Sequence, residues 1–246
     1  MTLAEILQPS CALFLDFDGT MVDIAPQPQA VHVPGPLLCV LQDLQRYLGG
    51  AVAVISGRPI AQIDAFLEPL QLPVAGVHGA ERRSADGTMS LLDTHPLDRV
   101  EEAARALAAQ HSGLLVETKR GSLALHYRLA PELEPEVLRA MQEAVDASPG
   151  VALLRGKMVA EAKPGGASKG RAIEDFLAEP PFSGRRPIFI GDDVTDEAGF
   201  LMVQKLGGIG FKVGDGATVA VGRLPDPLAL RRELEAAVAA RLTRTA

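Results

Sequence analysis

Two kinds of hydrophobic pattern alternate along this chain. Short apolar runs at residues 11–15, 51–55 and 187–190 are each followed by polar residues or glycine. Runs of this length predict strands that are buried on both faces. Between them, apolar residues recur every three or four positions, as they do over residues 37–48, and this spacing predicts helices. The alternation of the two patterns predicts an α/β fold with a doubly wound, mainly parallel sheet.

The pattern changes in the middle of the chain. Helical spacing over residues 97–110 and 133–147 is followed each time by two short strand patterns with turn residues between them. This order of helix, two strands, helix, two strands predicts a small α/β domain inserted into the larger one. We therefore expect a core of residues 1–94 and 165–246 and an insert of residues 95–164.

Composition limits the function classes. The chain has 246 residues, of which 47% are hydrophobic, and a formal net charge of −7. This length allows a sizeable core, and the lack of basic excess argues against nucleic acid or an anionic membrane as a partner. We expect no signal peptide in residues 1–10 and no membrane span anywhere. The two cysteines, Cys11 and Cys39, are expected to be buried thiols, as is typical of the cytoplasm.

An acidic segment, Asp16-Phe17-Asp18-Gly19-Thr20, follows the first predicted strand. Ligands of open α/β sheets bind beyond the carboxyl ends of strands, so Asp16 and Asp18 are expected to reach one small volume. Mg²⁺ would relieve their repulsion. Asp16 is a candidate nucleophile, Asp18 a candidate general acid and base, and Thr20 a hydroxyl donor to a phosphate oxygen. The alternative is a strand that ends in a solvated acidic turn.

A second acidic segment follows the strand expected at residues 187–190. Asp192 and Asp193 are placed to complete a Mg²⁺ site with residues of the first acidic segment. Asp196 lies one helical turn further and is expected to bind the metal, water or Lys169. The alternative is that these acidic residues cap a helix and interact with its dipole.

Two further polar residues stand at expected helix starts. Ser56 ends the second strand, where its hydroxyl and the N–H groups of the following helix would form an anion site. Lys169 opens a later helix, where the helix dipole disfavours a cation, so it is a candidate phosphate clamp. The alternatives are an ordinary N-cap for Ser56 and a solvated surface charge for Lys169.

These four segments, in this order, resemble the motifs of the phosphatases of the haloacid dehalogenase superfamily. The insert lies between the second and third motifs, where members of that superfamily carry a type-two cap. More narrowly, the chain resembles the trehalose-6-phosphate phosphatases over nearly its whole length. The matching segments are SGRP at 56–59, GVHGAE at 76–81, VETKRGSLALHYR at 116–128, EAKPGGASKG at 161–170 and GDDVTDEAGF at 191–200.

The resemblance implies a role for each matching residue. Asp16 would be the nucleophile and Asp18 the general acid and base, while Ser56 and Lys169 would bind the transferring phosphoryl group. The implied Mg²⁺ ligands are Asp16, Asp18 through its main-chain oxygen, Asp192 and Asp193. The implied substrate-binding residues are Glu117, Lys119 and Glu161 in the cap, followed by Thr20, Arg58, His78, Glu81, Arg128, Lys163 and Asp196.

Some of these roles have alternatives. Lys119 and Glu161 are equally well explained as exposed strand charges, and His126 is more often a packed histidine than a ligand. His78 and Glu81 are expected either to position the cap or to bind sugar, and the sequence does not separate the two.

The resemblance also implies a Rossmann-like core and an activity. This activity is Mg²⁺-dependent hydrolysis of trehalose 6-phosphate to trehalose and phosphate through an aspartyl-phosphate, in trehalose biosynthesis. One alternative is a phosphatase or phosphomutase for another sugar phosphate. Another is an inactive, sugar-phosphate-binding regulatory domain, although such chains commonly lack an aspartate of the first or last motif. We expect a cytoplasmic monomer whose only partner is the small-molecule substrate.

Overall fold

The computed structural model describes residues 2–25, 27–93, 96–119 and 121–242. The chain divides into two compact units, a core of Met1–Ser90 and Ser168–Ala246 and an insert of Leu91–Ala167. The expected limits of the insert, residues 95 and 164, lie a few residues inside these bounds. The expected boundary between residues 94 and 95 itself falls outside the described residues.

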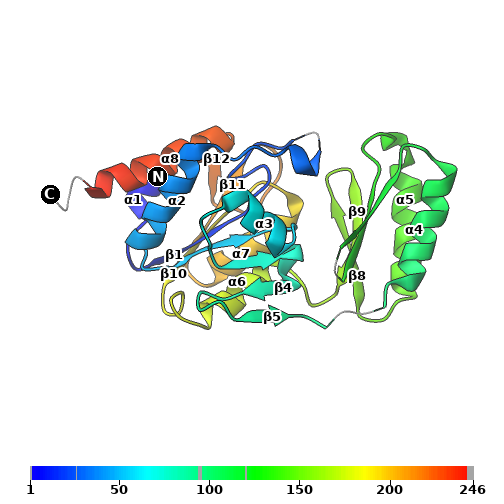
Figure 1. Cartoon of the computed structure of the whole chain (residues 1–246), viewed down its shortest axis with the longest axis horizontal. Coiled ribbons are helices and arrows are strands. Elements are labelled where there is room, and N and C mark those ends of the chain that lie inside the picture. Colours follow the sequence, from blue (N-terminus) through cyan, green and yellow to red (C-terminus); the bar gives the residue numbers. More distant parts are fainter. Residues whose placement is uncertain (1, 26, 94–95, 120, 243–246) are drawn as a thin grey trace. The chain divides into compact units, whose positions relative to one another are not determined.

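The core is built on an eight-stranded sheet in the order β12-β11-β10-β1-β2-β3-β4-β5 (Figure 1). The strands from β12 to β3 run parallel to their neighbours, and β4 runs antiparallel to β3. The strands are β1 (Cys11–Leu15), β2 (Val52–Ile55), β3 (Val74–Gly76), β4 (Glu81–Arg83), β5 (Met89–Leu91), β10 (Arg186–Gly191), β11 (Ile209–Val213) and β12 (Gly222–Leu224).

Helices cover this sheet in two layers (Figure 1). Helices α1 and α2 pack against α8, while α6 packs against α7. The chain extends the sheet from β1 in both directions, and right-handed crossovers in opposite directions place their helices on opposite faces of the sheet. The doubly wound, mainly parallel fold that the sequence predicts is therefore confirmed. The helices are α1 (Leu3–Ile6), α2 (Gly35–Tyr47), α3 (Ile60–Leu67), α6 (Lys169–Leu177), α7 (Glu197–Lys205) and α8 (Pro227–Leu242), with short 3₁₀ turns η1 (Pro28–Ala30), η2 (Val77–Gly79) and η4 (Val194–Asp196).

The strand order brings the acidic segments together. β1 and β10 are parallel neighbours with Leu15 opposite Ile190, so Asp16 and the residues after Gly191 leave the sheet at the same edge. β2 flanks β1 on its other side, and Ser56 follows it at that edge too. Both faces of these strands are covered, which is why all five residues of β1 are buried.

The expectation that both cysteines are buried is wrong for Cys39. Cys11 is buried in β1, whereas Cys39 is exposed on α2. The buried stripe of α2 consists of Leu37, Val40, Leu41 and Leu44, which recur at helical spacing. Position 39 falls on the opposite side of the helix from this stripe.

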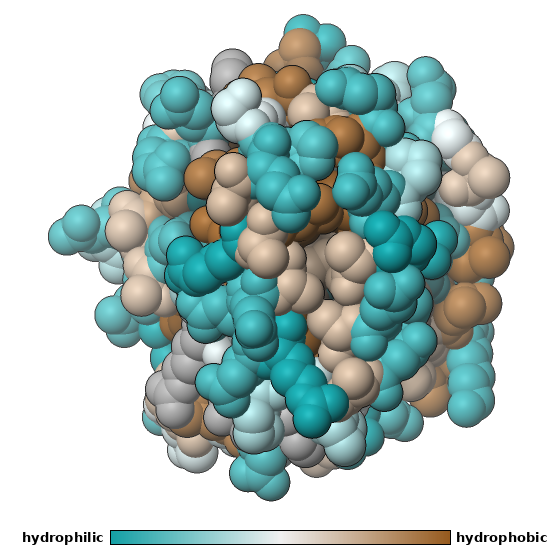
Figure 2. Space-filling model, turned by 90° about the vertical axis from the view of Figure 1, so that its right-hand side faces the viewer, coloured by the Kyte–Doolittle hydropathy of each residue, from teal (hydrophilic) through white to brown (hydrophobic). Residues whose placement is uncertain are grey.

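The insert is a four-stranded antiparallel sheet with two helices on one face. Leu123, Leu125, Ala160 and Ala162 point toward these helices and form a separate hydrophobic core with them. The helices' outer surface is mainly hydrophilic, as expected for amphipathic helices (Figure 2). The elements are α4 (Asp98–Gln110), β6 (Leu115–Lys119), β7 (Ser122–His126), η3 (Pro131–Leu133), α5 (Glu134–Asp146), β8 (Val151–Gly156) and β9 (Val159–Pro164), and the sheet order is β6-β7-β9-β8.

The other face of the insert's sheet is polar. Side chains alternate between the two faces of a strand, and the apolar ones point toward the helices, so the polar ones lie on the opposite face. Ala124 of β7 lies opposite Glu117 of β6 and Glu161 of β9, so these three side chains share one face. By the same register Lys119 pairs with Ser122 on that face. We call this surface the polar face of the insert. It gathers most of the cap residues that the resemblance implies for sugar binding.

Candidate active site

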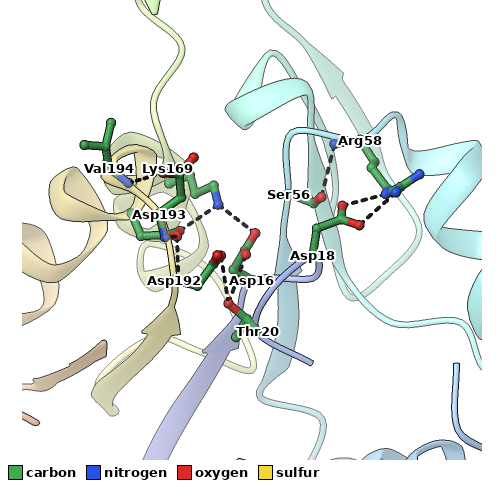
Figure 3. A network of polar contacts seen from close by, with 10 residues as sticks. Asp16, Asp18, Thr20, Ser56, Arg58, Lys169, Asp192, Asp193 and Val194 are labelled. Atoms are coloured by element: carbon green, nitrogen blue, oxygen red, sulfur yellow. Dashed lines mark hydrogen bonds and ion pairs between the residues drawn. The ribbon is translucent and has the colours of Figure 1, made fainter. Parts of the chain in front are cut away.

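A buried group of charges lies where β1 and β10 end (Figure 3). The ammonium of Lys169 donates to Asp16 Oδ1 and to Asp196 Oδ1, each at 2.6 Å. The Thr20 hydroxyl donates to Asp16 Oδ2 at 3.0 Å and lies 3.4 Å from Asp192 Oδ1. Asp16, Lys169 and Asp196 are respectively 4%, 3% and 0% exposed. Thr20 of the same segment and three residues from two distant segments, Lys169, Asp192 and Asp196, thus surround the Asp16 carboxylate.

Burial sets the electrostatics of this group. Burial raises the pKa of Asp16 well above its usual range, and the charge of Lys169 only partly offsets this. Burial and the nearby Asp196 carboxylate raise the pKa of Asp192 to about 6. Although burial disfavours an ammonium, Asp16 and Asp196 raise the pKa of Lys169 above its usual value. The centre therefore holds more carboxylates than its one lysine neutralises.

The crowding of carboxylates fits a divalent cation. Oxygen atoms of Asp16, Asp192 and Asp196 all lie within 4.8 Å of one another. Asp196 already accepts from Lys169 and, through Oδ2, from the backbone N–H groups of Asp192 and Asp193. Asp16 accepts one hydrogen bond at each oxygen, so Asp16 and Asp192 keep more acceptor capacity for a metal than Asp196, and hard oxygen ligands of this kind suit Mg²⁺.

Gly19 is required at the edge of this centre. Its φ of +76° lies in the left-handed region, and a Cβ atom there would lie 2.2 Å from Asp192 Oδ2. Glycine therefore lets the turn after β1 approach the Asp192 carboxylate closely enough for Thr20 to contact it.

Asp193 lies beside the centre but outside the carboxylate cluster. Its side chain accepts from the N–H of Val194 at 2.7 Å and forms a capping box with Asp196 at the start of η4. Asp193 therefore caps η4, which is the alternative that the sequence leaves open for these acidic residues. Its expected part in metal binding stays a prediction.

Asp18 points away from the cluster, toward Arg58 (Figure 3). Arg58 donates from Nε to Asp18 Oδ2 at 2.6 Å and from Nη2 to Asp18 Oδ1 at 2.7 Å, a bidentate ion pair. The guanidinium also lies over the rings of Phe17 and Phe66, at 5.9 and 5.1 Å from their centroids. The Ser56 hydroxyl accepts from the N–H of Arg58 at 3.1 Å, which ties the end of β2 to the same arginine.

His78 and Glu81 lie just beyond β3. Glu81 Oε1 accepts from the N–H of Ile60 at 2.6 Å, so its carboxylate binds the first residue of α3, where the helix dipole favours a negative charge. His78 has a left-handed backbone (φ 55°) and its ring packs against Gly57. Both residues therefore contact the segment that carries Ser56 and Arg58.

In the insert, Lys119 lies between two carboxylates on the polar face. Its Nζ is 3.9 Å from Glu117 Oε2 and 3.8 Å from Glu161 Oε1. Glu117 also contacts His126 Nε2 at 2.9 Å, and Glu161 accepts from the Ser122 hydroxyl at 2.8 Å. The contact with His126 lowers the pKa of Glu117, against the effect of burial. The structure thus joins the three leading cap residues in one network with His126.

Two other expected residues of the insert lie outside this network. Lys163 is buried and donates to the main-chain oxygen of Ala167, and burial lowers the pKa of its ammonium. Arg128 is exposed in the turn after β7. Their expected roles in substrate binding stay predictions.

Lys212, which was not predicted, is buried in β11 and donates to the main-chain oxygen of Asp192. Its signal in the sequence is a lysine inside the apolar run Ile-Gly-Phe-Lys-Val. The pairing of Arg58 with Asp18 was not predicted either, because spacing along the chain carries no signal for it. Across the described residues, no helix is long and apolar enough to span a membrane.

Comparisons with known proteins agree with this geometry. A family model described as trehalose-phosphatase matches residues 14–220. The chain is 45% identical over 224 residues to a probable trehalose-phosphate phosphatase of Sinorhizobium fredii (strain NBRC 101917 / NGR234), covering 89% of this chain and 84% of the relative. It is 44% identical over 231 residues to a trehalose-6-phosphate phosphatase of Escherichia coli (strain K12), covering 91% and 85%. Among solved structures, a trehalose-6-phosphate phosphatase related protein superposes with a TM-score of 0.79 at 28% identity, covering 95% of this chain and 99% of that one.

The doubly wound sheet with its inserted domain is the fold of a haloacid dehalogenase-like hydrolase from B. subtilis, which superposes with a TM-score of 0.65 at 14% identity, covering 91% of this chain and 99% of that one. Beyond the fold, the family model covers most of the chain and the relatives are aligned over nearly all of it. The chain belongs to the trehalose-phosphatase family.

Proposed function

We propose that this protein hydrolyses trehalose 6-phosphate to trehalose and phosphate, with Mg²⁺, in trehalose biosynthesis. The family and the name of the Escherichia coli relative support the substrate. The observation that carries the chemistry is the buried Asp16 carboxylate, bound by Lys169 and Thr20 and close to Asp192. A carboxylate held this firmly by short contacts is positioned to attack an incoming group.

In the proposed reaction Asp16 is the nucleophile. One of its oxygens attacks phosphorus, the bond from phosphorus to the sugar oxygen breaks, and an aspartyl-phosphate forms on Asp16. Water then attacks this intermediate and releases phosphate. Lys169 supports both steps, because its ammonium lies 2.6 Å from Asp16 Oδ1 and offsets negative charge at the reacting carboxylate.

Asp18 is proposed to give a proton to the departing sugar oxygen and to take one from the attacking water. In the structure both of its carboxylate oxygens accept hydrogen bonds from Arg58. Proton transfer to the sugar oxygen therefore requires Asp18 to give up at least one of these bonds. The phosphate group of the substrate also attracts a guanidinium, so its arrival would draw Arg58 away and let Asp18 take up from solvent the proton that it then gives to the sugar oxygen.

The residues that would hold Mg²⁺ are Asp16, Asp192 and the main-chain oxygen of Asp18, with Asp193 as a further candidate. The ion, when bound, would neutralise charge on the carboxylates and on the phosphoryl oxygens. Ser56 and Thr20 would add hydroxyl donors for those oxygens, whereas the first N–H of α3 is already bound by Glu81.

We propose that the polar face of the insert recognises the sugar. Glu117, Lys119 and Glu161 offer charged donors and acceptors to sugar hydroxyls, and small Ala124 between them leaves room. Arg128 and Lys163 are weaker candidates, because Arg128 lies in the exposed turn after β7 and the Lys163 ammonium donates to the main-chain oxygen of Ala167. His78 and Glu81 are better explained as residues that support the Ser56 segment, since Glu81 binds the start of α3.

We further propose that the enzyme acts as a monomer in the cytoplasm. Its two cysteines are both free, which suits a reducing compartment. Size-exclusion chromatography with light scattering tests the monomer, and a larger mass would overturn it.

Phosphate release with Mg²⁺ tests the proposed function, comparing trehalose 6-phosphate, glucose 6-phosphate and sucrose 6-phosphate. We expect a strong preference for trehalose 6-phosphate that EDTA abolishes and added Mg²⁺ restores. Equal activity on all three substrates would keep the phosphatase core and overturn the role of the polar face. No release from any of them, in folded protein, would favour a binding domain without activity.

A further inference from the structure

Lys212 is a buried lysine that belongs to none of the recognised motifs. It lies in β11, directly opposite Gly191 of β10, and is 6% exposed. Its Nζ donates to the main-chain oxygen of Asp192 and lies 3.4 Å from that of Val213. Within the described part of the chain, it forms no ion pair with a carboxylate. Burying a charged group against neutral carbonyl oxygens is costly, so an apolar residue would be the cheaper choice for packing alone.

The contacts of Lys212 complete a set that fixes Asp192 from three directions. The N–H of Asp192 donates to Asp196 Oδ2 at 3.0 Å, and its carbonyl accepts from Lys212. Its carboxylate meets the hydroxyl of Thr20. The two main-chain contacts hold the backbone on both sides of the Asp192 Cα atom. The direction of its side chain toward Asp16 follows from where this backbone is held.

We propose that Lys212 is a positioning residue for the metal site. Its hydrogen bond to the Asp192 carbonyl keeps the loop after β10 in the conformation that directs the Asp192 carboxylate toward Asp16. The inference rests on the proposed function in one respect, namely that Asp16 and Asp192 bind Mg²⁺. Residues that orient metal ligands in this way typically contribute strongly to metal affinity.

The direction of the change in Mg²⁺ affinity when Lys212 is replaced distinguishes a positioning role from a purely electrostatic one. An ammonium near a metal site repels the cation, so removing only its charge would tighten Mg²⁺ binding. Removing the hydrogen bond releases the Asp192 loop and weakens binding. A weaker affinity in a variant without the lysine can therefore come only from lost positioning.

The test is calorimetric titration of Mg²⁺ into the substrate-free protein, for the wild type, Lys212→Met and a control, Lys205→Met. Lys205 is exposed on α7, so its variant loses the same charge without a buried contact. We expect Mg²⁺ binding to weaken roughly 10- to 100-fold in Lys212→Met and to be unchanged in Lys205→Met.

Hydrogen exchange of the metal-free proteins gives a second readout. The N–H groups of Asp192 and Asp193 are bonded to Asp196, so their exchange reports the order of the loop without any metal. We expect faster exchange over residues 191–196 in Lys212→Met alone. If Lys212→Met does not fold, Lys212→Arg, which keeps the charge and the donors on a bulkier head, is expected to show the same changes with smaller size.

Unchanged or tighter Mg²⁺ binding together with unchanged exchange would overturn the role of Lys212. A wild type that does not bind Mg²⁺ would instead contradict the proposed function, and the exchange experiment would still test whether Lys212 orders the loop.

Discussion

Two regions of this molecule hold a lysine between two carboxylates, and they do so differently. In the core, Lys169 lies 2.6 Å from both Asp16 and Asp196, and all three side chains are almost fully buried. In the insert, Lys119 lies 3.9 and 3.8 Å from Glu117 and Glu161, and the Glu117 side chain is 32% exposed. The short, buried contacts of the core fit the proposed chemical step, whereas the longer contacts of the insert, with Glu117 partly exposed, fit the proposed binding of a sugar.

The two regions also differ in the direction of their pKa shifts. Burial raises the pKa of Asp16, whereas the contact with His126 lowers that of Glu117. A raised carboxyl pKa marks a charge that the fold buries at a cost in free energy, as functional sites often do. A lowered one marks charge that its neighbours stabilise. The predictions below test this difference between the two regions, from the largest expected effect to the smallest.

The largest effect is expected from Asp16→Asn. The amide keeps the size of the side chain but cannot attack phosphorus, so kcat should fall by at least about 10⁴-fold. Steady-state phosphate release measures it, and Asp215→Asn, an exposed site, is the matched control. Full turnover in Asp16→Asn would remove Asp16 from the role of nucleophile.

Lys169→Met should affect both activity and stability. It leaves the buried carboxylates of Asp16 and Asp196 without their cation, so the free energy of unfolding should fall by about 3–5 kcal/mol. Urea unfolding measures this. The same substitution at Lys119 should cost less than about 1 kcal/mol, because that lysine makes longer contacts and one of its two partners, Glu117, is partly exposed. Equal losses at the two sites would contradict the contrast between the regions.

Lys119→Met should instead act on substrate binding. We expect KM for trehalose 6-phosphate to rise at least about tenfold with little change in kcat, because a charged hydrogen bond to the sugar is lost away from the reacting bond. Lys157→Met, an exposed lysine of the same domain, is the control. A fall in kcat with KM unchanged would mean that the polar face takes part in the chemical step.

The smallest effect is a pH dependence of stability at Glu117. Its pKa is lower in the folded protein than its ordinary value of 4.5, so the stabilisation is present above that pH and is lost as the pH falls below it. Glu117→Gln should therefore lower the free energy of unfolding by about 0.5 kcal/mol at neutral pH, and the difference from the wild type should shrink as the pH falls below 4.5. Urea unfolding across this range measures it, and a constant difference would show that ionisation is not involved.

The architecture of the core was predictable because its strands are buried on both faces. β1, β2 and β10 appear as apolar runs, and helical spacing marks the segments between them. The helix α1 and the edge strand β12 were missed, since segments of four and three residues are too short to show a period. Cys39 was misplaced because its neighbours, not its own type, decide which side of α2 is buried.

The chemistry of the site was also predictable, as far as it lies in local spacing. The two acidic segments, Ser56 and Lys169 each stand next to a strand end or a helix start, and that position is visible in the sequence. Of the contacts between distant segments, that of Asp196 with Lys169 was one of three expected for Asp196, and others were not visible. Arg58 binds Asp18 across 40 positions, Glu81 binds Ile60 across 21, and Lys212 reaches Asp192 across 20.

The sequence by itself determined the class of fold, the insert and the residues able to do the chemistry, because each of these follows from patterns within a few neighbouring positions. Only the tertiary structure decided which partner each charge has. Strand order and register place side chains from separate segments at one edge of the sheet, and burial there makes their mutual contacts strong. Asp18 with Arg58, Asp196 with Lys169, and Lys212 beneath Asp192 all follow from that placement.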